Sequence, residues 1–425
     1  MTKKETVCVI GLGYVGLPLA VRAQECGYNI IGIELDKKKV DLINQKKSPI
    51  KDSFLYKNLP LFPIRATSNE KEIKKANIVL ICVPTPVDAQ YNPDLKPVRN
   101  ACKMIARNLK KGTLVILEST VNPGVSEEIV KPIFEEYGYK IGKDIFIAHC
   151  PERINPGDSK WNVTNIPRVV GAFTKKGLKQ AQKFYESIIN GEIRPMKHIR
   201  EAEACKVVEN SFRDVNIAFV NELAKSFDIL DIDIKDVIDG ASTKPFSFMP
   251  HYPSRGIGGH CIPVDPYYLI ERAKQAGFDH KFLRASRAIN NSMPDYTVEL
   301  LQDKLNEVKL PLNGTNIGIL GISYKANVDD DRESPYYQIV NALKKYKAKI
   351  ISFDPHLKEK SICKSLVTLL KKSDALILVT NHREFEVLDG KFLKKYDIKV
   401  IIDGMNCLDK EDIKKNKIIY KGIGR

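Results

Sequence analysis

The chain has 425 residues, of which 43% are hydrophobic and 28% charged, so it is long enough for two or three domains with sizeable cores. It has no apolar run of about 18 or more residues, which argues against a membrane-spanning helix. Its first residues include lysines but no apolar segment of the signal-peptide type, so we expect neither secretion nor a membrane partner.

The net charge of +16 comes from short lysine clusters that are spread along most of the chain. Because no aromatic-interleaved basic stripe accompanies them, we expect no nucleic-acid partner, although a positive field suits small anionic ligands such as nucleotides. The nine cysteines show no paired short spacing, which favours a reducing, cytoplasmic compartment over a disulfide framework.

Short strands rich in β-branched residues alternate with amphipathic segments in the first half of the chain. The expected strands are residues 6–10, 29–35, 77–83 and 113–119. The segments between them have the pattern of helices. This alternation predicts βαβ units and a doubly wound parallel sheet.

The middle of the chain is predicted to be helical. Residues 201–230 contain no glycine or proline, and their apolar residues recur at helical spacing, so we expect one long helix. A second helical stretch is expected over roughly residues 267–308.

The last third returns to alternation, with strands expected at residues 316–323, 348–354, 375–380 and 399–404. Within it, a strand, a glycine, a helix and a strand that ends in an acidic residue follow one another, as they do at the start of the chain, which suggests a loose repeat. Residues 309–315 have the composition of a linker. The predicted fold class is therefore α/β, with two Rossmann-like doubly wound domains joined by a central helical region. The expected bounds are 1–198, 199–308 and 309–425.

A glycine-rich turn follows the first strand. Gly11, Gly13 and Gly16 form GxGxxG around Tyr14 and Val15, a pattern that lets a pyrophosphate approach a helix N-terminus. Glu34 ends the next strand 18 residues past Gly16, where an acid binds a ribose 2′-hydroxyl and repels a 2′-phosphate. The pattern therefore predicts NAD rather than NADP. Asp36 is the rival acid, but its position favours capping of the next helix.

Other polar residues follow the expected strands or share a helix face. Thr85 and Thr120 lie just past two parallel strands, where such sheets bind ligands, and Glu152 follows the apolar run before it. Lys206 and Asn210 are four residues apart on the long helix and so share one face, which could equally be a solvated surface.

The segment GIGGHCIPVDP places Cys261 among glycines and before Asp265. A zinc site is not expected from His149–Cys150 or His260–Cys261, because adjacent residues on extended backbone point to opposite faces. Cys261 combined with NAD suggests a thiolate that attacks an aldehyde, with a thiohemiacetal and then a thioester as covalent intermediates. We interpret the glycines as access for the substrate carbon.

The motifs GLGYVGLPLA, CVPTP, EST, PERINPG, KVVENSFRDVNIAFVNE, GIGGHCIPVDP and GISYKANVDDDRESP occur in this order. Together they resemble the UDP-glucose/UDP-mannuronate dehydrogenase family of nucleotide-sugar 6-dehydrogenases over nearly the whole chain. The resemblance implies an N-terminal NAD domain, a central helix used for dimerisation and a C-terminal UDP-binding domain.

The resemblance also implies roles for single residues. Cys261 would be the nucleophile, and the other catalytic residues would be Lys206, Asn210, Asp265, Glu152 and Thr120. The cofactor would contact Gly11, Gly13, Tyr14, Val15, Gly16, Glu34, Thr85, Thr120 and Arg332. The nucleotide-sugar would contact Arg153, Ile154, Lys206, Asn210, Arg213, Gly258 and Lys325.

The resemblance is greatest to the branch that oxidises acetamido sugars, with UDP-N-acetylglucosamine ahead of UDP-N-acetylmannosamine and UDP-glucose. The chain departs from that branch at Ser254 and Arg255, where relatives often carry Pro-Gly-Pro-Gly, so Arg255 could contact substrate or a neighbouring subunit. A two-electron hydroxyacid dehydrogenase is the alternative enzyme, but it has no need of Cys261 or a second α/β domain. A non-catalytic nucleotide sensor is the alternative outside enzymes.

Overall fold

The computed structural model describes residues 5–88, 92–154 and 160–425. The chain forms two compact units, each built around its own sheet. The first unit consists of Met1–Glu209 and Tyr267–Phe278, and the second of Asn210–Pro266 and Asp279–Arg425.

The first unit contains an eight-stranded sheet in the order β3-β2-β1-β4-β5-β6-β7-β8. All neighbouring strands are parallel except β6 and β7, which are antiparallel. The strands are β1 (Thr6–Ile10), β2 (Asn29–Ile33), β3 (Arg65–Thr67), β4 (Ile78–Ile81), β5 (Leu114–Leu117), β6 (Phe146–His149), β7 (Arg168–Ala172) and β8 (Ile193–Pro195). The helices are α1 (Gly16–Glu25), α2 (Lys37–Asn44), α3 (Ser53–Asn58), α4 (Lys96–Asn108), α5 (Lys131–Glu136) and α6 (Lys175–Ile188).

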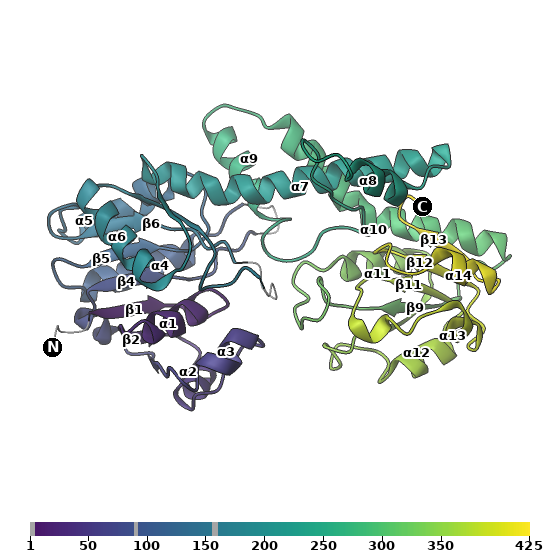
Figure 1. Cartoon of the computed structure of the whole chain (residues 1–425), viewed down its shortest axis with the longest axis horizontal. Coiled ribbons are helices and arrows are strands. Elements are labelled where there is room, and N and C mark those ends of the chain that lie inside the picture. The colour runs from purple at the N-terminus through teal and green to yellow at the C-terminus, as the bar shows by residue number, and fades with distance from the viewer. Residues whose placement is uncertain (1–4, 89–91, 155–159) are drawn as a thin grey trace. The chain divides into compact units, whose positions relative to one another are not determined.

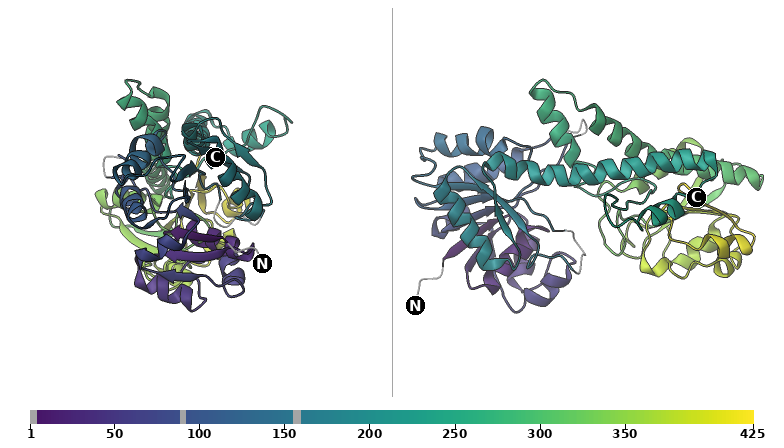
Figure 2. Two further views of the ribbon diagram at one scale, coloured as in Figure 1. Left: turned by 90° about the vertical axis from the view of Figure 1, so that its left-hand side faces the viewer. Right: turned by 45° about the horizontal axis from the view of Figure 1, so that its top comes forward.

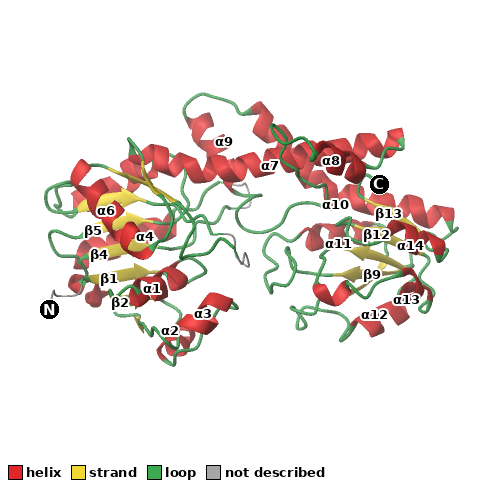
Figure 3. Ribbon diagram, viewed as in Figure 1, coloured by secondary structure: helices red, strands yellow, loops and turns green. Residues whose placement is uncertain are grey.

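Both faces of this sheet are covered, which explains its nearly continuous apolar strands. Val7 and Val9 of β1 pack in one core with residues of α1 and α6, whereas Cys8 and Ile10 pack in the other with residues of α4 and α5. Figure 3 shows helices on both sides of the strands. The carboxyl ends of β1, β4 and β5 therefore meet at one edge, where the predicted cofactor residues follow.

The second unit has a five-stranded parallel sheet in the order β10-β9-β11-β12-β13. Its strands are β9 (Asn316–Leu320), β10 (Lys349–Phe353), β11 (Ala375–Leu378), β12 (Val400–Asp403) and β13 (Ile419–Gly422). Its helices are α8 (Ile234–Ala241), α10 (Lys281–Glu307), α11 (Pro335–Lys345), α12 (Leu366–Lys372), α13 (Gly390–Lys394) and α14 (Lys410–Lys415). Residues of α10 and α11 share one core with the sheet, and residues of α12, α13 and α14 share the other (Figure 1).

The long central helix is confirmed as α7 (Ile199–Leu230), which begins in the first unit and ends in the second. Figure 2 shows it as one continuous helix. The single helical stretch expected over 267–308 is wrong, because it is divided into α9 (Asp265–Gln275) and α10. Gly277 (φ +86°) ends α9, and the N–H of Phe278 donates to the carbonyl of Ala273 at 2.8 Å, as at many helix C-termini.

The predicted α/β class with two parallel-sheet domains and a central helical region is confirmed. Among the described residues, no helix combines the length and the apolar character needed to cross a membrane.

Candidate functional site

The glycine turn after β1 fits a dinucleotide. A Cβ at Gly11 (φ +89°) would lie 2.7 Å from the carbonyl oxygen of Cys82, and a Cβ at Gly16 would lie 2.0 Å from that of Gly11. Only glycine fits at these two positions. Around Gly13, by contrast, a Cβ would meet no heavy atom within 4 Å. The turn is thus closed on its inner side and open at Gly13, before the N-terminus of α1, as pyrophosphate binding requires. Val15 directly precedes α1, and Tyr14 is 40% exposed.

Glu34 reaches this turn. Its Oε2 accepts a hydrogen bond from the N–H of Leu12 at 3.1 Å, and its Oε1 accepts from the N–H groups of Leu35 and Asp36 at 2.8 and 3.1 Å. The carboxylate is therefore held beside the glycine turn, where an adenosine ribose would lie. Asp36 instead accepts from Lys38 N–H at 2.9 Å and caps α2, as expected.

We expect Glu34→Ala to weaken NAD binding by about 10- to 100-fold, because hydrogen bonds from the ribose to a charged acceptor are lost. NADP binding should weaken less, because the repulsion of the 2′-phosphate is lost as well. Titration of both cofactors would measure the two changes. Asp36→Ala is the matched control, since it removes a neighbouring acid that caps a helix. Equal use of NAD and NADP by the native protein would contradict the assignment of Glu34.

The two predicted hydroxyl residues of the sheet edge are linked to each other. Thr85 follows β4, and its Oγ1 donates to the carbonyl of Thr120, which follows β5, at 2.8 Å. Tyr268 of α9 donates its hydroxyl to the carbonyl of Thr85. These bonds fix the two loops at the carboxyl edge, and Thr120 is half-buried there.

Glu152 follows β6 and is 7% exposed. Its Oε1 accepts from the N–H groups of Arg153 and Ile154 at 2.6 and 2.7 Å. Its Oε2 accepts from the buried guanidinium of Arg168 at 2.8 Å. The carboxylate is thus held in one orientation. The end of the PERINPG motif, residues 155–157, lies outside the described residues.

Arg153, which the resemblance assigns to the nucleotide-sugar, is bonded within the first unit. Its Nη2 lies 2.6 Å from Oε1 of Glu209 on α7, and its Nη1 donates to the carbonyl of Pro167 at 3.0 Å. Lys206, one turn earlier on α7, is half-buried. Arg213, which the resemblance also assigns to the nucleotide-sugar, lies further along α7 in the second unit and is exposed.

In the second unit, the structure brings Asn210 and Asp265 together. Nδ2 of Asn210 donates to Oδ2 of Asp265 at 2.5 Å, and both side chains are buried. The N–H groups of Val264 and Asp265 donate to the carbonyl of Cys261 at 3.0 and 2.8 Å. The half-buried Cys261 therefore lies in a turn that leads into α9, and its carbonyl is held by these two hydrogen bonds.

The glycines before Cys261 pack closely against residues 324–335. A Cβ at Gly258 would lie 2.6 Å from the Cβ of Tyr324 and 2.9 Å from the carbonyl oxygen of Glu333. Gly259 (φ +89°) donates its N–H to the carbonyl of Arg332 at 3.0 Å, and its Cβ would lie 2.9 Å from the ring of Tyr324. These glycines are required by packing, a reason that the interpretation as substrate access had missed. The contact also brings the loop of Cys261 to the segment that carries Lys325 and Arg332.

Arg255 is an internal residue of this loop, with 4% exposure. Its Nη1 and Nη2 donate to the carbonyls of Gly256 and Tyr324, both at 3.0 Å, and burial lowers its pKa to about 10. It thus joins the two segments within the unit, whereas the sequence suggested contact with substrate or a neighbouring subunit. Arg332 pairs with Asp330, its Nη2 lying 2.6 Å from Oδ2.

The loose repeat between the first and the last third of the chain includes the acidic residue that follows the second strand of each. Asp354 follows β10 and accepts from the N–H groups of Ile322 and Ser323 at 2.7 and 2.9 Å, much as Glu34 accepts from Leu12. Its Oδ2 also lies 3.1 Å from Nε2 of the buried His382, whose Nδ1 accepts from the N–H of Asn327 at 2.9 Å. This network anchors the loop that carries Lys325.

His382 is also one of three side chains that could hold a metal ion in the described part of the chain. Ligand atoms of His356, His382 and Glu384 lie within 4.8 Å of one another. Because both ring nitrogens of His382 are already bonded, we interpret this cluster as part of the loop anchor.

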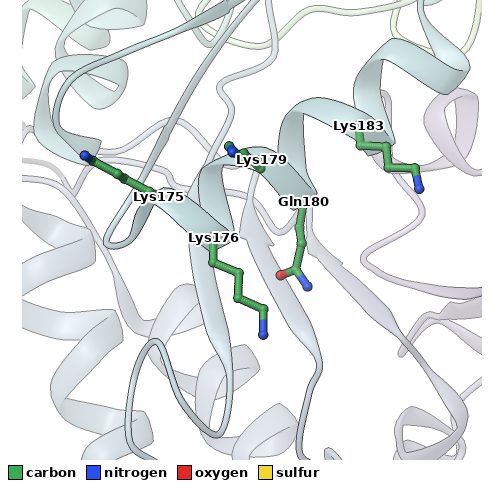
Figure 4. A pocket seen from close by; sticks show the side chains of 5 residues that line it. All are labelled: Lys175, Lys176, Lys179, Gln180 and Lys183. Carbon is green, nitrogen blue, oxygen red and sulfur yellow. The ribbon is translucent and has the colours of Figure 1, made fainter.

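Lysines of a single helix line a hollow on α6 (Figure 4). Its lining consists of Lys175, Lys176, Lys179, Gln180 and Lys183. These side chains come from one helix, and none is a predicted site residue.

Sequence reasoning missed three residues that contact Glu152 directly or through one partner: Glu118, Arg168 and Tyr185. The motif EST contained Glu118, but only the hydroxyl of Thr120 was selected from it. No spacing rule connects Arg168 or Tyr185 to Glu152.

Three models of the UDP-glucose/GDP-mannose dehydrogenase family match the chain in order. They describe the NAD binding domain at residues 5–189, the central domain at 200–292 and the UDP binding domain at 318–410.

Individual proteins are similar along almost the whole chain. UDP-N-acetyl-D-mannosamine dehydrogenase of Pyrococcus horikoshii is 32% identical, with 99% of each chain covered. UDP-N-acetyl-D-glucosamine 6-dehydrogenase of Pseudomonas aeruginosa is 33% identical, with 96% of this chain and 99% of the relative covered. A solved structure described as UDP-D-ManNAc dehydrogenase from Pyrococcus horikoshii is 32% identical and has a TM-score of 0.92, with 99% of each chain covered.

Proposed function

Because the chain belongs to the UDP-glucose/GDP-mannose dehydrogenase family, we propose that it oxidises the C6 hydroxymethyl group of a UDP-N-acetylhexosamine to a carboxylate. The predicted family, the dehydrogenase activity and the NAD cofactor are confirmed. UDP-N-acetylglucosamine is our first candidate substrate, and UDP-N-acetylmannosamine and UDP-glucose are the alternatives.

Support for an acetamido sugar comes from two sources. The segments before and including GIGGHCIPVDP resemble the acetamido-sugar branch. The similar proteins from Pyrococcus horikoshii and Pseudomonas aeruginosa are named for the two epimers of a UDP-acetamido sugar.

We infer that the reaction removes four electrons in two steps. NAD supplies the hydride acceptor for both oxidations. In the proposed chemistry Sγ of Cys261 adds to the C6 aldehyde, which gives a thiohemiacetal, and oxidation of that adduct gives a thioester. Water then adds to the thioester carbon, the C–S bond breaks, and the thiolate leaves with the carboxylate as product.

The remaining residues have supporting roles in this proposal. Lys206 and Asn210 stabilise the oxyanions with a charge and an N–H donor. Glu152 accepts the proton of the attacking water, and Thr120 and Asp265 position that water. The fixed orientation of Glu152 and the Asn210–Asp265 hydrogen bond suit residues that must act in one geometry.

A panel of UDP-sugars tests the proposal. With excess NAD, we expect two NADH per UDP-acetamido sugar at completion and a uronic acid as product. UDP-glucose should react with a kcat/KM roughly ten- to hundredfold lower, because a buried partner of the acetamido group would be left without a hydrogen bond.

The outcomes of the panel separate the parts of the proposal. One NADH per sugar, with aldehyde accumulating, would exclude the covalent mechanism. Two NADH with a clear preference for UDP-glucose would retain the mechanism and reject the acetamido assignment.

We also propose a cytoplasmic homodimer or higher oligomer that supplies a uronic acid for surface polysaccharide or glycan synthesis. The resemblance assigns dimerisation to the central helix. Phe212 and Phe219 of α7 support this, since they are 48% and 56% exposed and lie two helical turns apart on one face. We retain the predicted division into an NAD domain, a central region and a UDP domain at 1–198, 199–308 and 309–425.

A further inference from the structure

A buried charge cluster in the first unit connects three neighbouring strands. Glu118 lies one residue past the end of β5, Glu152 follows β6, and Arg168 begins β7. Nη1 of Arg168 lies 3.0 Å from Oε2 of Glu118, and its Nη2 lies 2.8 Å from Oε2 of Glu152. The side chains of Arg168 and Glu118 are 0% exposed, and that of Glu152 is 9% exposed.

One guanidinium thus serves two carboxylates. Both of its outer nitrogens are used, one for each acid, which only the planar fork of an arginine allows. Because water is excluded, the interaction of these charges is stronger than at the surface. Whatever changes the charge of Glu118 therefore changes the electrostatic environment of Glu152.

Glu118 is the member whose charge is poised to change near neutral pH. Burial raises its pKa to about 7, against the opposing effect of Arg168. The hydroxyl of Tyr185 on α6 donates to its Oε1. The other titratable groups facing the cluster are the thiols of Cys82 after β4 and Cys150 after β6, and burial raises the pKa of each, so both stay neutral.

We propose that Arg168 and Glu118 are positioning residues for Glu152. Arg168 holds the carboxylate of Glu152 in its working orientation, and the charge of Glu118 determines how much of the positive charge of Arg168 acts on Glu152. The inference rests on the proposed role of Glu152 as the base in thioester hydrolysis.

The direction of the effect follows from the charges. With Glu118 ionised, two carboxylates share one guanidinium, so less of its positive charge acts on Glu152. With Glu118 neutral, Arg168 pairs with the charge of Glu152 alone, and more of its positive charge acts there. Because burial places the pKa of Glu118 at about 7, acid formation should speed up as Glu118 ionises near that pH, and removing the charge of Glu118 should abolish this rise.

The test is the pH profile of acid formation in Glu118→Gln, which keeps the size of the side chain and removes its charge. We expect the native rise in rate near pH 7 to be absent in this variant. Tyr185→Phe provides a second variant, because losing the donated hydrogen bond leaves Glu118 neutral over a wider pH range. Its rise in rate should lie at higher pH than the native one. Thermal unfolding and NAD binding establish that each variant is folded.

Glu152→Gln separates this inference from the proposed function. If Glu152→Gln forms acid at the native rate, the proposed role of Glu152 is wrong. If Glu152→Gln loses acid formation but folded Glu118→Gln and Tyr185→Phe both keep the native rise in rate near pH 7, the role of Glu152 stands and the positioning role of the cluster is rejected.

Discussion

Replacement of Cys261 by serine is expected to reduce formation of the uronic acid by at least about a thousandfold. A serine hydroxyl is ionised far less than a thiol near neutral pH, and an oxygen ester is a poorer acyl intermediate than a thioester. Serine keeps nearly the same size, so the hydrogen bonds from Val264 and Asp265 to the backbone carbonyl at 261 should remain. The loss should therefore report chemistry rather than a displaced loop.

Mass spectrometry and NADH yield would measure this result together. In Cys261→Ser we expect aldehyde or a trapped ester in place of acid. Cys407→Ser is the matched control, because Cys407 is an exposed cysteine of the same unit and should leave the rate unchanged. Native rates of acid formation in Cys261→Ser would exclude a covalent thioester.

The meeting of Glu34 with the glycine turn could be predicted from sequence because its geometry is local. A strand, a glycine turn and an acid 18 residues later follow one another within a single βαβ unit, so spacing determines that Glu34 returns to the turn. The helix cap at Asp36 is local in the same sense. The break between α9 and α10 was also marked locally, by Gly277, but the helical pattern on both sides obscured it.

The charge cluster could not be predicted, because it depends on sheet order. Glu118 and Arg168 are 50 residues apart, and Glu152 and Arg168 are 16 apart. They meet because β5, β6 and β7 are neighbours, and the antiparallel placement of β7 was not expected from the βαβ alternation. A buried arginine at the start of a strand has no periodic signature.

The glycines before Cys261 illustrate the same limit. The sequence shows that the glycines have no side chains, but it does not show which residues lie against them. Access for substrate was therefore the natural interpretation. The space beside the glycines is occupied by residues 324–335 of the same chain, more than sixty positions later in the sequence. The hydrogen bond from Gly259 N–H to the carbonyl of Arg332 joins the two segments. A glycine that only provides access should tolerate alanine far better than one that contacts backbone.

Gly258→Ala distinguishes these interpretations and is expected to lower kcat by about a hundredfold. No positive φ is involved at this position, so the effect is steric: the new methyl group would lie 2.6 Å from the Cβ of Tyr324, 2.9 Å from the carbonyl oxygen of Glu333 and 2.9 Å from Cδ of Pro335. None of these atoms is the end of a flexible side chain, so the loop must shift, and a displacement near 1 Å at a reacting group lowers the rate by about a hundredfold.

NAD affinity should stay at the native value, because the glycine turn and Glu34 belong to the other unit. Gly240→Ala in α8 is the matched control, since its Cβ would meet no heavy atom within 4 Å and alanine favours a helix. If Gly258→Ala keeps the native kcat while it is folded and binds NAD, the close packing of this loop is not needed for catalysis, and access becomes the better explanation of its glycines.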